Sequence, residues 1–371
     1  MPLTGPLKED RPVAHLTVVV GARPNFMKVA PIMRALDGHV ETTLVHTGQH
    51  YDARMSDVFF GQLRLPEPDV NLDVRSGSHA RQTAAVMVAF DDHLAEAKTD
   101  GVVVVGDVNS TLAAGLVASK RNIAVAHVEA GLRSSDWTMP EEVNRVVTDR
   151  LSRWLFTPSA DADDNLRAEG IDAARVHLVG NVMIDSLLTH LEAASARGRV
   201  VAAGAVGSGR YGVATLHRPA NVDDPARLFR LLEALGAAAP QLQIVFPVHP
   251  RTAARVADAG YAVPDNIRCL DPLPYLDFVG LVAGAAVVVT DSGGIQEETS
   301  VLGVPCLTVR DNTERPVTCT LGTNTLVGTD PARLGPAMQA ALSATWAPAE
   351  IPLWDGHAGE RIAKVLIDDL G

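Results

Sequence analysis

The chain has 371 residues, more than the ~250 to 300 at which a single hydrophobic core stops growing, so two domains are expected. Its 32 Lys and Arg against 44 Asp and Glu give a net charge of -12. Such an acidic chain lacks the broad basic surface that binding to nucleic acid needs. The three cysteines form no C-x-x-C pair, so neither a disulfide framework nor a structural zinc site is predicted, and a reducing cytoplasm is expected.

The apolar segments are too short for export or membrane insertion. Residues 1–12 are polar and contain proline, unlike a secretory signal. The longest apolar run, residues 278–290, falls short of the ~20 residues that span a bilayer. We expect this run to be the end of a helix followed by a buried strand, and we expect no membrane partner.

Short β-branched runs alternate with longer helical patterns in the first half of the chain. This alternation predicts βαβ units and a parallel sheet, an α/β fold. The predicted strands are residues 16–21, 42–47, 101–107 and 124–130, and the predicted helices are residues 27–36 and 110–121.

The alternation breaks at residues 190–210, where Gly, Ala and Arg form a segment of low complexity, and then resumes. Two Rossmann-like domains joined near residue 190 are therefore predicted, residues 1–188 and 189–356. Their ligand should lie in the cleft between them, at the carboxyl ends of the strands. The predicted elements of the second half are strands at residues 213–217, 243–249, 287–291 and 305–310 and a helix at residues 228–238.

No cofactor site is predicted. Gly207, Gly209 and Gly212 match the G-x-G-x-x-G pattern, but this pattern must follow a strand, and here it precedes one. The first strand-to-helix turn, residues 21–25, also lacks the glycine spacing, so no NAD site is expected. Because there is no H-E-x-x-H motif, Cys/His cluster or G-x-S-x-G elbow, no metal and no hydrolase chemistry are expected either.

Charged residues follow two predicted strands of the first half. Arg23 and Lys28 stand where a strand passes into a helix, and they could converge on an anion at the helix N-terminus. A solvated pair at a helix start is the alternative. Asp107 follows a run of four valines and either caps the next helix or works in a cleft.

Residues 127–145 hold a denser set of charges. A helix that starts after a proline explains one of Glu141 and Glu142 as a favourable first-turn anion. It does not explain Glu129, which ends a predicted strand and is followed by a Gly turn and Arg133. This arrangement indicates chemistry in a cleft.

In the second half, His217 and Arg218 directly follow the first predicted strand. Residues 290–298 combine a strand end, a Ser-Gly-Gly turn and a helix start, which can bind phosphate through backbone amides. Glu298 could accept hydrogen bonds from ribose hydroxyls, and Arg315 could face a second phosphate. The alternatives are a simple helix cap and a surface salt bridge.

Together these motifs resemble the non-hydrolysing UDP-N-acetylglucosamine 2-epimerases, in that family's order from residue 16 to about 328. The resemblance implies the glycosyltransferase-B architecture, two Rossmann-like domains facing a central cleft, with a C-terminal helix at residues 357–371 rejoining the first domain. It also implies a homodimer that makes UDP-N-acetylmannosamine for envelope polysaccharides. The matching segments are residues 21–28, 47–50, 106–114, 127–133, 140–145, 179–187, 215–218, 290–298 and 310–316.

The resemblance implies a role for each site residue. Asp107, Glu129 and Glu141 would do the acid and base work, and His217 would lie beside the diphosphate. Phe278 would lie near the uracil. The full set expected to bind substrate is Arg23, Lys28, Arg133, Arg218, Phe278, Ser292, Gly293, Gly294, Glu298 and Arg315.

The resemblance further implies a neighbouring pocket in which substrate activates the enzyme, with Gln49, His50 and His249 contributing. Residues 51–52 and Ala220 depart from the residues usual in the family. Because a lost hydrogen-bond partner costs about 1 to 3 kcal/mol, activation by substrate should be weaker here.

The expected reaction is inversion at C2 of the sugar. That C–H bond is not adjacent to a carbonyl, and no NAD site is predicted, so elimination and re-addition of UDP is the favoured route. A carboxylate would remove the C2 proton while cations stabilise the departing diphosphate. The alternatives are a hydrolysing 2-epimerase, a glycosyltransferase acting on a related nucleotide sugar, or a nucleotide-sugar sensor without activity.

Overall fold

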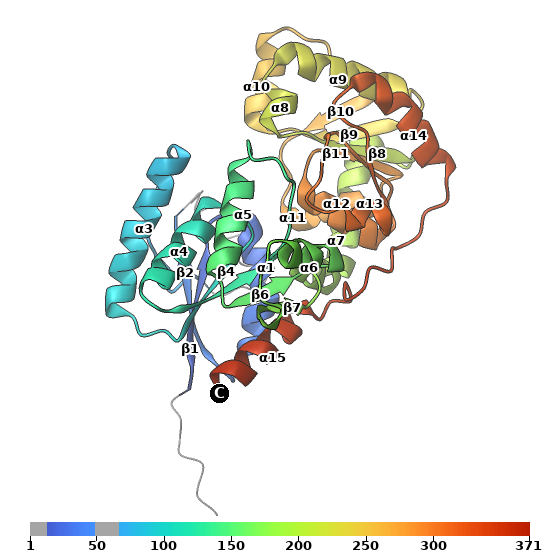
Figure 1. Cartoon of the computed structure of the whole chain (residues 1–371). Coiled ribbons are helices and arrows are strands. Elements are labelled where there is room, and N and C mark those ends of the chain that lie inside the picture. Colours follow the sequence, from blue (N-terminus) through green and yellow to red (C-terminus); the bar gives the residue numbers. More distant parts are fainter. Residues whose placement is uncertain (1–12, 49–66) are drawn as a thin grey trace, which may run out of the picture.

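The computed structural model describes residues 13–48 and 67–371, which form two lobes, each built on a parallel sheet (Figure 1). The first lobe holds β1 (His15–Val20), β2 (Glu41–His46), β3 (Val70–Asn71), β4 (Gly101–Val105), β5 (Ala124–Val128), β6 (Trp154–Thr157) and β7 (Val176–Leu178). The second lobe holds β8 (Tyr211–Thr215), β9 (Gln243–Pro247), β10 (Ile267–Leu270), β11 (Val287–Thr290), β12 (Cys306–Thr308) and β13 (Asn324–Leu326).

Helices connect the strands and cover the sheets, with short 3₁₀ turns at Ala173–Arg175 and Pro331–Arg333. The first lobe carries α1 (Arg23–Leu36), α3 (His79–Glu96), α4 (Asn109–Lys120), α5 (Pro140–Leu151), α6 (Ala160–Ala168) and the start of α7 (Val182–Val206). The second lobe carries α8 (Pro219–Val222), α9 (Pro225–Ala238), α10 (Pro250–Asp258), α11 (Tyr275–Ala283), α12 (Gly293–Leu302), α13 (Val317–Thr320) and α14 (Leu334–Ser343). The last helix is α15 (Ala358–Leu370).

The predicted α/β fold with two Rossmann-like sheets is confirmed. Each predicted strand and helix of the sequence coincides with an observed element to within a few residues. The valine runs of β4 and β11 are almost fully buried, because strands of a parallel sheet are covered on both faces. The apolar run at residues 278–290 forms most of α11 and then β11, as expected. Within the described residues, no helix is long and apolar enough to cross a membrane.

The strand order reverses once in each sheet. The first sheet runs β3-β2-β1-β4-β5-β6-β7 and the second β10-β9-β8-β11-β12-β13, so the reversals lie at β1/β4 and β8/β11. Connections leave opposite sides of a sheet at such a point and open a crevice at the carboxyl ends of the strands. Asp107 follows β4, and His217 follows β8. The two reversal points therefore carry predicted site residues.

One expectation about the connection is wrong. The low-complexity segment predicted to break the pattern is helical up to Val206, within the 25-residue helix α7. Its small residues permit close packing: a Cβ on Gly198 would lie 2.0 Å from the backbone of Gly280 in α11. Early in the same helix, Ser186 Oγ donates to the Met27 carbonyl of α1 at 2.6 Å. Helix α7 thus packs against both lobes, and we propose that the domain boundary lies within it.

After α14 the chain returns to the first lobe, where α15 lies against α1 (Figure 1). Asp185 of α7 accepts hydrogen bonds from the backbone amides of Ala358 and Gly359 at 3.1 and 2.7 Å. A carboxylate from another helix thereby caps the N-terminus of α15. We propose that α15 is part of the first domain.

Candidate active site

A cleft of about 720 Å³ lies between the lobes, at the two reversal points. It brings together predicted site residues from both halves of the chain. From the first lobe it is lined by His79, Asp107, Asp136, Thr138, Met139, Pro140, Glu141 and Arg145, and from the second by His217, Arg218, Pro219, Ala220, Asn221, Gly293, Gly294, Val309, Arg310, Asp311, Asn312, Glu314, Arg315 and Thr329.

Asp107 is placed by a tight turn. The preceding Gly106 has φ +67°, and a Cβ there would lie 3.0 Å from Lys28 Nζ, so the turn requires glycine. Asp107 Oδ2 lies 2.5 Å from Arg145 Nη2. Burial raises the pKa of the Asp107 carboxyl, but the charges of Arg145, Lys28 and Arg315 outweigh it and lower the pKa below its usual value. Asp107 is therefore ionised and able to accept a proton.

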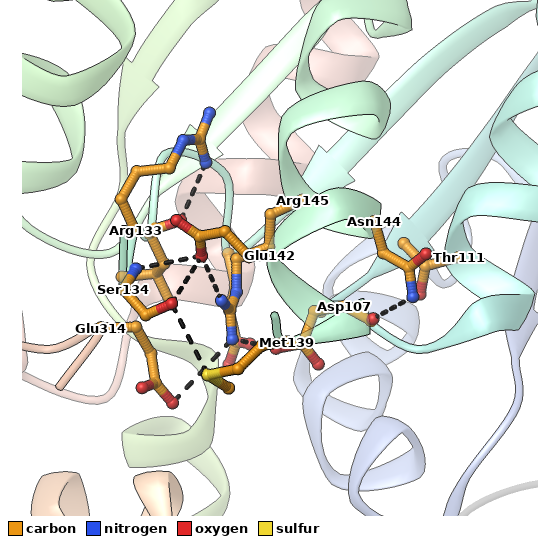
Figure 2. Close-up of polar contacts among 12 residues, drawn as sticks. Asp107, Thr111, Arg133, Ser134, Met139, Glu142, Asn144, Arg145 and Glu314 are labelled. Atoms are coloured by element: carbon orange, nitrogen blue, oxygen red, sulfur yellow. Dashed lines mark hydrogen bonds and ion pairs between the residues drawn. The ribbon is translucent and has the colours of Figure 1, made fainter. Parts of the chain in front are cut away.

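Arg145 is a site residue that the sequence analysis did not single out. It rises from α5, one turn after Glu141, and only 3% of its side chain is exposed. Its guanidinium contacts Asp107, Glu142 at 2.7 Å and, from the other lobe, Glu314 at 3.9 Å (Figure 2). The sequence of residues 140–145 could have indicated Arg145, because a residue four positions after Glu141 lies on the same face of the helix.

The neighbouring glutamates of α5 differ in their surroundings. Glu142 is buried and accepts hydrogen bonds from Ser134 N, Ser134 Oγ, Ser135 N and Arg145 Nη1, which fixes the loop before the helix. Glu141 lines the cleft, and its side chain makes no hydrogen bond or ion pair among the described residues. The geometry thus leaves Glu141 free to face a ligand and gives Glu142 a structural role.

Glu129 follows β5 in a backbone conformation that is rare for residues other than glycine, with φ +68°. Its Oε2 lies 2.5 Å from Lys28 Nζ, and its buried Oε1 has no hydrogen-bond partner among the described residues. Neither residue is among those lining the cleft, so Lys28 is paired with Glu129 instead of being free for an anion. The Arg23 side chain, its expected companion, lies outside the described part of the structure.

Arg133 is not brought to the cleft. Its guanidinium points away from Arg145 (Figure 2) and pairs with Asp149 at 2.7 Å and Glu169 at 2.6 Å. Asp149 also contacts His127 Nδ1 at 2.6 Å and accepts from Gly131 N at 3.1 Å. Sequence spacing suggested cleft chemistry, but the two carboxylates Asp149 and Glu169 hold this side chain away from the cleft. Its role here is to support the turn that follows Glu129.

His217 is oriented by Asp291, a fully buried carboxylate that follows β11. The His217 ring Nδ1 lies 2.9 Å from Asp291 Oδ1, while 53% of the ring side chain is exposed. Asp291 also accepts from the backbone amides of His217 and Arg218 and from Asn221. Burial raises the pKa of Asp291, but these contacts, led by His217, lower it overall. Asp291 therefore fixes one ring nitrogen of His217.

The Ser-Gly-Gly turn opens α12, as predicted. Ser292 is the N-cap residue, but its side chain makes no capping hydrogen bond. A Cβ on Gly293 would lie 2.6 Å from Arg315 Nη1, whereas one on Gly294 would meet nothing within 4 Å. Gly293 and Gly294 line the cleft together with Arg315, and a helix start beside a cation is an arrangement that can bind phosphate.

Arg315 and Glu298 lie on the two sides of this turn. Arg315 is buried and pairs with Glu297 and Glu314, each at 2.6 Å. It is therefore no surface salt bridge, although two carboxylates already share its charge. Glu298 accepts a hydrogen bond from the Tyr275 hydroxyl at 2.9 Å, which leaves its second oxygen for a ligand. Burial raises the pKa of Glu298 to about 7.

A second, smaller pocket of about 270 Å³ adjoins the cleft and shares His217 with it. Phe278 and His249 line it, together with Ser292 and aliphatic side chains. This places Phe278 in an apolar pocket beside the Ser-Gly-Gly turn. His249 caps α10, where its ring accepts from Arg251 N at 3.3 Å. Gln49 and His50, the other expected regulatory residues, lie outside the described residues.

Comparison with known proteins agrees with this geometry. A family model described as UDP-N-acetylglucosamine 2-epimerase matches residues 34–367. The chain is 41% identical to the UDP-N-acetylglucosamine 2-epimerase of Methanocaldococcus jannaschii, covering 95% of this chain and 98% of that protein. It is 38% identical to the UDP-2,3-diacetamido-2,3-dideoxy-D-glucuronate 2-epimerase of Pseudomonas aeruginosa, covering 95% and 99%.

The fold is similar to that of a solved relative. The crystal structure of the M. jannaschii UDP-GlcNAc 2-epimerase, in complex with UDP-GlcNAc and UDP, superposes with a TM-score of 0.87 at 40% identity, covering 95% of this chain and 99% of that one. Family model, sequence identity and fold extend over nearly the whole chain and agree with the motifs at the cleft. The chain belongs to the UDP-N-acetylglucosamine 2-epimerase family.

Proposed function

We propose that this chain interconverts UDP-N-acetylglucosamine and UDP-N-acetylmannosamine by inversion at C2, through elimination and re-addition of UDP. One observation carries the proposal: the carboxylates Asp107 and Glu141 of the first lobe face the same cleft as Gly293 and Gly294 of the second. Carboxylates suited to acid and base work and a helix start suited to phosphate thus line one cleft, which supports the proposal.

The second lobe fits the UDP portion. The amides at the start of α12 and Arg315 would hold the diphosphate, and the apolar pocket around Phe278 has the size and lining for a uracil ring. Glu298, with one oxygen fixed by Tyr275, would accept from the ribose hydroxyls. His217 lines both pockets and so would stand beside the diphosphate.

The first lobe fits the chemistry at C2. In the forward step a carboxylate takes the C2 proton, the C–H electrons form the C1–C2 double bond, and the C1–O bond breaks with its electrons on the diphosphate. A proton then adds to the other face of C2, and the diphosphate oxygen returns to C1. We propose that Asp107 and Glu141, which line the cleft, face the two sides of C2, because each face needs its own group. Glu129, paired with Lys28 outside the cleft lining, would complete the set of three carboxylates.

Cations support the leaving group. Arg145, Arg218 and Arg315 line the cleft, and a diphosphate that departs with its bonding electrons gains most from positive charge already held in place. In a chain of net charge -12 this local cluster of arginines is what makes binding of an anionic substrate favourable.

Solvent exchange tests the reaction. Proton NMR of the purified protein with UDP-GlcNAc in deuterated water should show UDP-ManNAc forming without added metal, with deuterium at C2 of the product. An unchanged C2 proton during turnover would contradict elimination. Free UDP released in step with the sugar would indicate a hydrolysing enzyme or a transferase instead.

A second UDP-sugar should be tested as a substrate in the same assay. Because the 38% identical Pseudomonas relative is named for UDP-2,3-diacetamido-2,3-dideoxy-D-glucuronate, this compound should be assayed in parallel. We expect UDP-GlcNAc to have the higher kcat/KM, as the 41% identical relative is named for it. The reverse ranking would reassign the substrate within the same reaction.

We also propose that the protein is a cytoplasmic homodimer that supplies envelope polysaccharide synthesis. Exposed valines on two helices of the first lobe support a dimer: Val88 on α3, and Val143 and Val147 on α5. The three cysteines are free thiols, as in a reducing compartment. Light scattering of the purified chain should give twice the mass of 39.2 kDa.

A further inference from the structure

Glu314 is a buried carboxylate surrounded by four arginines. Its Oε1 lies 2.6 Å from Arg315 Nη1 and 3.9 Å from both Arg145 Nη2 and Arg218 Nη2. Its Oε2 lies 2.7 Å from Arg310 Nη2, and only 3% of its side chain is exposed. Because Arg145 belongs to the first lobe and the other three to the second, one carboxylate gathers cations from both walls of the cleft.

The four arginines do not depend equally on Glu314. Arg145 and Arg315 each form ion pairs with other carboxylates. In the described part of the chain, Arg218 and Arg310 have an ion pair with Glu314 alone. Arg310 Nη1 is buried without a hydrogen-bond partner there, and burial together with the charge of Arg310 lowers the pKa of Arg218. These two guanidinium groups are therefore under-compensated positive charges.

Glu314 also lies beside the phosphate-binding turn. A Cβ on Gly293 would stand 2.8 Å from Glu314 Oε1. A carboxylate so close to an anion site repels the anion unless cations engage it. Burial raises the pKa of Glu314, but Arg315, Arg310 and Arg145 lower it far more, so the group is charged. At this position the Glu314 carboxylate opposes the binding of an anion to the turn. We attribute its presence to the order that it imposes on the arginines.

We propose that Glu314 is a positioning residue that holds Arg218 and Arg310 in place for the departing diphosphate while its own charge limits how tightly the diphosphate is bound. The inference rests on the proposed function, in which the diphosphate must leave C1 and return. Interactions that hold the substrate and the departing diphosphate equally tightly do not raise kcat. Cations that are ordered but partly neutralised therefore suit a reaction in which the diphosphate leaves C1 and returns.

The isosteric substitution Glu314→Gln separates binding from catalysis. It removes a negative charge beside the turn, so the Kd for UDP and for inorganic pyrophosphate should stay the same or decrease. It also removes the 2.7 Å ion pair of Arg310 and the 3.9 Å contact of Arg218, whose Nε stays hydrogen-bonded to the Asp291 carbonyl. The kcat should therefore fall about 100-fold, the scale of losing one preorganised group of this kind. Glu314→Asp keeps the charge one methylene further away, and it should retain wild-type UDP affinity with an intermediate kcat.

The experiment compares calorimetric Kd values for UDP and pyrophosphate with kcat and KM for UDP-GlcNAc. The matched control is Glu169→Gln, which removes a carboxylate from Arg133 away from the cleft and should leave both sets of values unchanged. An Arg310→Gln, Glu314→Gln double variant should lose less kcat than the two single effects combined, because Glu314 acts partly through Arg310.

Three results would overturn the proposal: near-wild-type kcat in Glu314→Gln, weaker UDP binding in proportion to the loss of kcat/KM, or additive effects in the double variant. If Glu314→Gln does not fold, Glu314→Asp carries the test, and a wild-type kcat in it would count against the proposal. If the wild-type chain itself does not epimerise, the proposed function fails, and the UDP and pyrophosphate affinities still decide the effect of Glu314 on binding.

Discussion

The two adjacent glutamates at the start of α5 have different roles because different groups surround their side chains. Glu142 accepts four hydrogen bonds from the preceding loop and Arg145, whereas Glu141 faces the cleft. A charged group with many buried donors is costly to alter, and a group facing solvent is not. The two residues therefore form a matched pair for substitution.

We expect Glu141→Gln to lower kcat at least ~100-fold with little change in stability or UDP affinity, because it removes a proton-transfer group. Glu142→Gln should instead lower the free energy of unfolding by about 3 kcal/mol, because it weakens a buried ion pair. Urea denaturation and steady-state kinetics on both variants check this. The assignment is wrong if Glu141→Gln keeps near-native kcat.

Glu298 predicts a pH dependence of stability. Its pKa is raised by burial from 4.5 to about 7, so the folded state binds the proton more tightly than the unfolded state. The resulting stabilisation is complete below pH 4.5 and is lost as the pH rises through 7. It amounts to at most about 3 kcal/mol.

The measurement is the free energy of unfolding between pH 4.5 and 8 for the wild type and for Glu298→Gln. Because other groups titrate in both proteins, the difference between the two curves isolates Glu298. The wild type should lose stability relative to the variant as the pH rises. Parallel curves would show that Glu298 is not the protonated group.

At the scale of elements, the close crossing of α7 and α11 depends on glycine. A Cβ on Gly280 would lie 1.8 Å from the Ala194 carbonyl oxygen, so Gly280→Ala must push the helices apart. We expect it to cost about 3 kcal/mol, the upper part of the usual range for overpacking.

Gly204 of α7 provides the control. It is exposed, and a Cβ there would meet nothing within 4 Å. Gly204→Ala should therefore stabilise the protein by about 0.5 to 1 kcal/mol, because alanine favours the helix. Thermal denaturation of both variants would reveal opposite shifts in Tm, and a common sign would contradict the packing argument.

At the scale of the molecule, the return of α15 to the first lobe depends on Asp185. No side chain of the residue preceding α15 caps that helix, and Asp185 of α7 accepts from its first two amides instead. Asp185→Ala should cost about 2 kcal/mol, through a lost cap and a lost charge at a helix N-terminus. It should also speed proteolysis at the C-terminus.

Asp224→Ala is the matched control, because Asp224 caps α9 at an exposed position within one lobe. It should cost about 1 kcal/mol without changing C-terminal proteolysis. Mass spectrometry of the proteolytic fragments compares the two variants. Equal fragment patterns would show that Asp185 does not hold α15 to the first lobe.

The sequence by itself determined the two parallel sheets and the ends of their strands. Runs of buried valine, glycine turns and helical periodicity are local signals, and the carboxyl ends of parallel strands share an edge. Asp107, Glu129, His217 and the turn at Ser292 could therefore be predicted as candidates without knowing the fold.

Only the tertiary structure decided which charges face one another. Arg133 and Arg145 look alike in the sequence, yet one is held by Asp149 behind a turn and the other meets Glu314 of the opposite lobe. The helical α7 was also missed, because its small residues resemble a loop until α11 packs against them. Pairing across lobes depends on distances that local patterns do not encode, and those distances give each charged group its role.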